Sequence, residues 1–212
     1  MQNNSINVQS ITPITAYFAI FAAIASISAA AILIRVALGE LMPPVLIAAS
    51  RLFVASVILT PITLTRYKPH IMKLTRTELL LASISGIFLA IHFIAWVSSL
   101  QYTTVLVSVV IVTSGPVWVA ILEVIFLRIR LSKLVILGLV IALVGGLYIG
   151  LGGQNEAPAE VQATAEANTN TIGAILSWVG AVAVSVYMLI GRKLRTTLPV
   201  IPYIWLVYGI AT

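Results

Sequence analysis

Long apolar runs alternate with short polar connections along the whole chain. A bilayer core of about 30 Å is crossed by a helix of about 20 residues, and six runs match that length. They cover residues 14–38, 43–65, 79–99, 103–127, 133–151 and 171–191. A seventh run begins near Pro199 and is still apolar at Thr212, so we expect a fragment that ends inside a helix.

Composition agrees with this pattern of spans. Hydrophobic residues make up 60% of the chain and charged residues 8%, whereas about a quarter of the residues in a soluble domain are charged. We therefore predict an all-α integral membrane protein, a multi-pass helical bundle. Cysteine and aspartate are absent and histidine is scarce, so we expect no cofactor and no metal site. The first 15 residues lack Lys and Arg, unlike a cleaved signal peptide, so the first run is expected to be a retained helix.

Apart from Arg35 and Arg51, the basic residues lie in or at the edges of alternate connections between the predicted spans. They are Arg66, Lys68, Lys73 and Arg76 after the second span, Arg128, Arg130 and Lys133 after the fourth, and Arg192, Lys193 and Arg195 after the sixth. Lys and Arg accumulate in cytoplasmic loops. We therefore predict a bacterial plasma-membrane protein with residues 1–13 as a cytoplasmic tail and residues 152–170 as an external polar loop. This placement explains the net charge of +6 without a nucleic-acid partner.

Two predicted spans carry ridges of small residues at four-residue spacing, which let helix backbones approach closely. One ridge consists of Gly138, Ala142, Gly146 and Gly150, and the other of Gly173, Ser177, Ala181 and Ser185. We interpret both ridges as helix-packing surfaces.

The order of segments near the start of the chain recurs near its end. A span followed by a cation, a proline and another span occurs around Arg35 and Pro43, and again around Arg192 and Pro199. Five spans separate the copies, an odd number, so the second copy is expected to be inverted in the membrane. Inverted repeats are typical of transporters that hold a substrate near the membrane midplane.

Short motifs continue this pattern through both copies. They are Arg35, Pro43-Pro44 with Arg51, Leu100-Gln101-Tyr102-Thr103, Gly115-Pro116-Val117, Leu131-Ser132 with Gly138 and Gly145-Gly146, then Gly173 and Gly191-Arg192-Lys193-Leu194-Arg195. In this order the chain resembles the EamA family of the drug/metabolite transporter superfamily. The resemblance covers about residues 16–151 and 171–212. It implies ten helices in two inverted repeats: residues 14–151 would form the first five-helix repeat and residues 171–212 the start of the second.

One position departs from the family pattern. Relatives usually have a glutamate in the loop after the fourth helix, and the corresponding residue here is Ile129. Glu123 lies six residues earlier and therefore on another helical face. The role of that glutamate in relatives is not carried over to this chain.

Ionisable residues within the spans are the first candidates for a site. Arg51 has no carboxylate at its depth, so either it ties helices together through carbonyls and hydroxyls or it meets an anionic substrate group. His92, at a similar depth, is either functional or a neutral histidine bonded to a neighbouring helix. Trp96 shares its face and either lines a cavity or belongs to the interfacial aromatic belt. Arg35 is expected to extend to the outer surface towards Glu40.

The fourth span contributes a second face, with Thr113, Pro116, Ala120 and Glu123 at three- and four-residue spacing. Proline removes a helical hydrogen bond, so we predict a kink at Pro116 that lines a cavity. Glu123 is either a coupling carboxylate or the partner of Arg128 in an interfacial ion pair.

We therefore expect a transporter that exports a small organic metabolite or drug by alternating access between inverted repeats. Its expected partners are the lipid bilayer and a small-molecule substrate, and the chain could form a homodimer. A non-transporting accessory subunit is the alternative. A membrane-embedded enzyme is a further alternative, although no catalytic constellation is visible in the sequence.

Overall fold

The computed structural model describes residues 13–152 and 167–212, which are helical with no strand in those ranges. The helices are α1 (Pro13–Gly39), α2 (Pro44–Arg66), α3 (Lys68–Met72), α4 (Arg76–Tyr102), α5 (Val105–Thr113), α6 (Gly115–Leu127), α7 (Lys133–Gly152), α9 (Ala167–Leu194) and α10 (Val200–Ala211). Five segments in these ranges are long and apolar enough to cross a membrane, with α5 and α6 together forming one of them. The prediction of an all-α, multi-pass membrane protein is confirmed.

The observed elements differ from the predicted spans at three places. The span predicted over residues 103–127 is two helices, α5 and α6, separated at Ser114. The short helix α3 was not predicted, and α4 starts after it at a Thr75 capping box with Glu78. Helix α9 begins at Ala167, inside the predicted external loop, of which residues 153–166 lie outside the described ranges.

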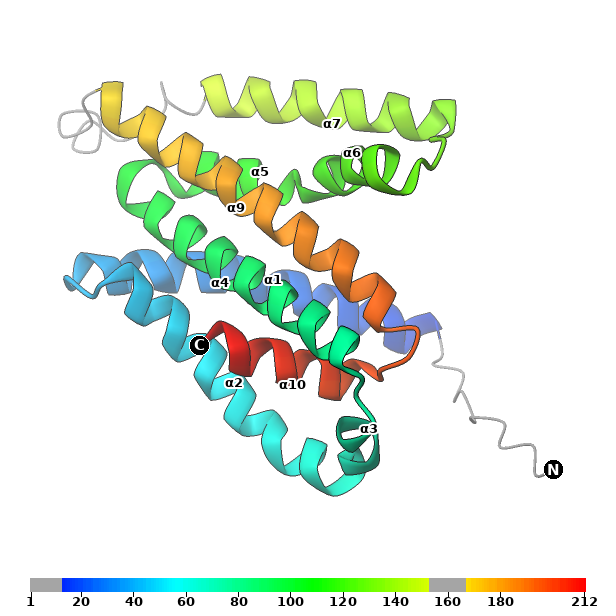
Figure 1. The fold of residues 1–212 in the computed structure, drawn as a ribbon. Helices are drawn as coiled ribbons and strands as arrows, with labels where there is room; N and C mark the ends of the chain where they lie inside the picture. Colours follow the sequence, from blue (N-terminus) through cyan, green and yellow to red (C-terminus); the bar gives the residue numbers. More distant parts are fainter. Residues whose placement is uncertain (1–12, 153–166) are drawn as a thin grey trace.

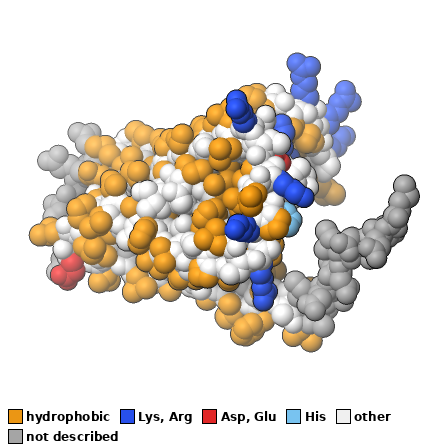
Figure 2. Space-filling view, turned by 60° about the horizontal axis from the view of Figure 1, so that its bottom comes forward, with side chains coloured by type: hydrophobic (Ala, Val, Ile, Leu, Met, Phe, Trp, Pro, Cys, Tyr) orange, Lys and Arg blue, Asp and Glu red, His pale blue; other side chains and the backbone are white. Residues whose placement is uncertain are grey.

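The helices run back and forth, so that their connections alternate between two ends of the molecule. The α2–α4, α6–α7 and α9–α10 connections lie at the end where α1 begins (Figure 1). The Lys and Arg side chains gather at this same end in the space-filling view (Figure 2). The alternation of charge predicted from the sequence is therefore a real separation of charge in space, as expected for a protein that crosses a bilayer.

Helices α4 and α9 form the centre of the bundle and run side by side (Figure 1). The small residues of α9 allow this contact, since Ser177, Ala181 and Ser185 are completely buried. At Gly173 a Cβ atom would come within 2.7 Å of the Thr103 Cβ, so only glycine fits there. The packing ridge predicted on α9 is confirmed.

The ridge predicted on α7 does not pack in the same way. No atom lies within 4 Å of the place where a Cβ of Gly138 would be, and Ala142 is exposed. The side chains at positions 146 and 150 lie outside the described residues. The close-packing prediction is wrong at Gly138, because α7 contacts mainly α5 and the small residues there do not face that neighbour.

Helix α10 packs between α2 and α4 and completes a hydrophobic core cluster with them (Figure 1). Leu52, Tyr203 and Val207 are buried there. The backbone of α4 approaches α10 closely at Gly86, where a Cβ atom would lie 2.7 Å from the Ile210 Cγ2. One packed unit is thus formed around the contact between α4 and α9. It consists of α1, α2, α4, α9 and α10.

Candidate functional site

The fourth span breaks where the sequence places a proline. Pro116 has no backbone N–H to donate, and the chain turns at Ser114, whose Oγ donates to the Ile111 carbonyl at 2.6 Å. The Gly115 carbonyl, next to the break, accepts a hydrogen bond of 3.0 Å from the Ser185 Oγ of α9. The predicted kink is confirmed, and a serine of a neighbouring helix bonds the backbone beside it.

A cavity of about 600 Å³ lies between α1, α2, α4 and α5. Four of the candidate residues named from the sequence line it: Arg51, His92, Trp96 and Thr113. Pro116 does not line it and is exposed. The remaining walls are almost entirely aliphatic, with Ser28 of α1 as a further polar contribution.

Arg51 extends from α2 over two aromatic rings of α4. Its Cζ lies 5.3 Å from the centroid of Phe93 and 5.7 Å from that of Trp96, within the range of cation–π attraction. Its Nη1 is buried and has no hydrogen-bond partner in the described part of the chain. The carbonyl and hydroxyl partners considered for Arg51 are therefore not observed, and stacking against α4 takes their place.

His92 lies beside this cation and joins the two central helices. Its Nδ1 donates to the Gly180 carbonyl of α9 at 2.8 Å, because a carbonyl oxygen can only accept. Its ring stacks on Trp96 with 6.1 Å between centroids. The interpretation of His92 as a histidine bonded to a neighbouring helix is confirmed, and the same side chain also lines the cavity.

Trp96 is part of the core. It is only 6% exposed, and its Nε1 is a second buried donor without a partner among the described residues. An interfacial-belt tryptophan would face lipid and headgroups. That interpretation of Trp96 is therefore wrong, because the ring lies beside Arg51 and belongs to a buried core cluster with Ala31, Ile34, Val97 and Leu100.

Arg35 takes a different partner from the one expected. Its Nη1 donates to the carbonyls of Leu100 and Thr103, the latter at 3.0 Å, and it does not reach Glu40. The last carbonyls of a helix have no intrahelical partner and carry partial negative charge. Arg35 therefore caps the C-terminal end of α4 and fixes the corner between α4 and α5.

Glu123 forms an ion pair, but with Arg192 of α9 at 2.5 Å and not with Arg128. Arg128 ends α6 in the left-handed conformation, with φ of 52°. The regular helix therefore stops before Arg128, and Arg128 does not share the helical face of Glu123. The carboxylate side chain is 14% exposed. The pair thus links the first predicted repeat to the second at the end of the molecule rich in basic residues.

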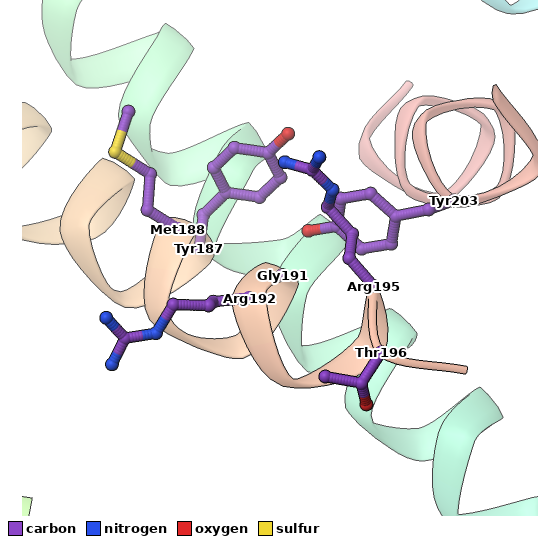
Figure 3. Close-up of a pocket in the computed structure, with 7 residues that line it drawn as sticks. All are labelled: Tyr187, Met188, Gly191, Arg192, Arg195, Thr196 and Tyr203. Atoms are coloured by element: carbon purple, nitrogen blue, oxygen red, sulfur yellow. The ribbon is translucent and has the colours of Figure 1, made fainter. Parts of the chain in front are cut away.

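A second pocket, of about 630 Å³, lies at that same end between α9 and α10. Tyr187 and Tyr203 stack against each other there with 6.1 Å between centroids. Arg195 extends towards the two rings, whereas Arg192 points away from them (Figure 3). Ser85 of α4 bonds the Tyr203 hydroxyl at 2.9 Å. This pocket was not predicted from the sequence. The eight-residue spacing of Tyr187 and Arg195, about two helical turns, was the available signal.

The cavity and the broken span lie within the part of the chain that matches a family of known proteins. The model of the EamA-like transporter family matches residues 14–151. The chain belongs to this family. Membrane transport is accordingly the general activity that its family indicates. No curated protein and no solved structure matches the chain significantly.

Proposed function

We propose that this EamA-like protein exports a small organic metabolite across the plasma membrane, with its N-terminus in the cytoplasm. The cavity between α1, α2, α4 and α5 is the substrate site. Its volume, about 600 Å³, is within the range of roughly 300–1,000 Å³ typical of small-molecule sites.

The observation that carries this proposal is Arg51 on the wall of a cavity whose lining is otherwise mostly apolar. A charged residue within a span is costly to insert, about 2.5–3.5 kcal/mol on insertion scales, and commonly marks a substrate pathway. A residue that only held helices together would satisfy its donors on a neighbouring helix, as Arg35 does. Arg51 lines the cavity, and its buried Nη1 has no acceptor among the described residues.

Alternating access supplies the mechanism of the proposal. The first repeat would move relative to the second at the contact between α9 and helices α4 to α6. Three polar links cross that contact: His92 to the Gly180 carbonyl, Ser185 to the Gly115 carbonyl, and the Glu123–Arg192 ion pair. Such links can break and re-form between two packed arrangements, which is the behaviour that a bistable interface requires.

The test is release of metabolites from proteoliposomes loaded with a bacterial small-molecule extract, followed by mass spectrometry. Vesicles with the wild-type protein should release at least one metabolite faster than protein-free vesicles. Arg51→Ala should abolish that release, while Arg66→Ala, at the exposed end of the same helix, should not. Equal reconstitution of all three proteins is the control, and release that survives in Arg51→Ala would rule out the substrate role of Arg51.

A further inference from the structure

The positive charge of Arg51 is not neutralised by any described residue. Glu40 lies exposed at the turn after α1, Glu78 bonds threonines at the opposite end of the bundle, and Glu123 is paired with Arg192. Removing a charge from water without a counter-charge is strongly unfavourable. The cavity wall therefore carries a cation for which the described chain, residues 13–152 and 167–212, supplies no anion.

Two residues that line the cavity each carry a buried N–H donor without an acceptor among the described residues. The donors are the Nη1 of Arg51 itself and the Nε1 of the adjacent Trp96. The aromatic rings beneath Arg51 attract the cation, but an aromatic face does not satisfy the N–H groups at the edge of a guanidinium as a carboxylate does. A carboxylate accepts hydrogen bonds only, and its two oxygens match the fork of an arginine. The wall thus lacks an anionic oxygen acceptor.

The rest of the cavity has the opposite character. Ile24 and Ile27 of α1 and Val105, Val109 and Val112 of α5 line it with aliphatic surface. Such a surface favours an apolar body and gives no partner to a second charge or to a sugar-like array of hydroxyls. A ligand that suits both parts has one charged end and a hydrophobic remainder.

We propose that the cavity selects an amphipathic organic monoanion, with a carboxylate at Arg51 and Trp96 and an apolar body against α1 and α5. This inference rests on the proposed function for its claim that the cavity is the substrate site. Organic cations are rejected because Arg51 repels them. Neutral analogues are disfavoured because they bring no negative charge, so the charge of Arg51 stays uncompensated when they bind.

The experiment compares three ligands with one apolar body: 1-naphthylacetate, 1-naphthylacetamide and 2-(1-naphthyl)ethylammonium. Each is titrated calorimetrically into the purified full chain in detergent, with empty micelles as the blank. The wild-type protein should bind the carboxylate at least about tenfold more tightly than the amide, as one charge-assisted hydrogen bond implies, and the amine most weakly. Arg51→Gln should remove the preference, and the matched variant Arg66→Gln should retain it.

Trp96→Phe provides a second variant, which keeps an aromatic side chain but removes the Nε1 donor together with the five-membered ring of the indole. It should weaken the carboxylate by about threefold to tenfold and the amide by less, because a hydrogen bond to a charged acceptor is the stronger one. A carboxylate that binds no more tightly than the amide, or a preference that survives in Arg51→Gln, overturns the inference. If the protein releases metabolites but binds the amine more tightly than the carboxylate, only the anion inference is wrong. If the carboxylate binds in an Arg51-dependent way but no metabolite is released, only the transport proposal is wrong.

Discussion

Two arginines within apolar helices show how differently the same side chain can be used. Arg35 donates to two carbonyls at the end of α4, where helix geometry leaves acceptors free. Arg51 lies over aromatic rings with a donor unsatisfied. The first arrangement fixes a corner of the fold, and the second leaves a charge beside a cavity. We therefore predict that Arg35 contributes to stability, whereas ligand recognition is the role that we propose for Arg51.

Replacement of Arg35 by alanine should destabilise the protein. Hydrogen bonds to a charged group contribute about 1.5–3 kcal/mol each, so the loss of two should cost about 3 kcal/mol or more of the free energy of unfolding. Denaturant unfolding in detergent micelles measures it, with Arg66→Ala as an exposed arginine control. Unchanged stability in Arg35→Ala would show that the contact to Leu100 and Thr103 is not a structural tie.

At the scale of the elements, the same pattern of small residues forms a packing surface on α9 but not at Gly138 of α7. The ridge of α9 lies in the most extensive helix contact of the molecule, whereas Gly138 of α7 faces open space. Small residues at four-residue spacing permit close approach, but the pattern does not say whether a partner is present. The partner is set by how the whole chain folds.

This difference predicts opposite effects of one added methyl group. Gly173→Ala places a Cβ 2.7 Å from that of Thr103 and should cost about 1–3 kcal/mol, as overpacking of a core does. Gly138→Ala meets no atom and should be neutral or stabilising, since alanine is the better helix former. The shift in thermal unfolding temperature of the two variants in the same detergent tests this, and equal shifts would contradict the observed α4–α9 contact.

At the scale of the whole molecule, the features that depend on local sequence were predictable. Span lengths follow from apolar runs, and the break of the fourth span follows from the donor that Pro116 lacks. The partners of Glu123 and Arg35 were assigned to near neighbours in sequence, Arg128 and Glu40, and both assignments were wrong. Their true partners are more than 60 residues away, and only the packing of α1, α4, α6 and α9 brings them together. The cavity residues were predicted one by one, but their convergence at one wall depended on that same packing.

The central claim is that substrate passes through the cavity between α1, α2, α4 and α5. The chain contains no cysteine, so Thr113→Cys places a single thiol on the cavity wall and Gly138→Cys places one on the exposed side of α7. Release of metabolites from proteoliposomes is measured before and after reaction with a bulky thiol reagent. We expect the reagent to stop release by Thr113→Cys and to leave Gly138→Cys and the wild-type protein unaffected. Undiminished release by fully modified Thr113→Cys would contradict transport through this cavity.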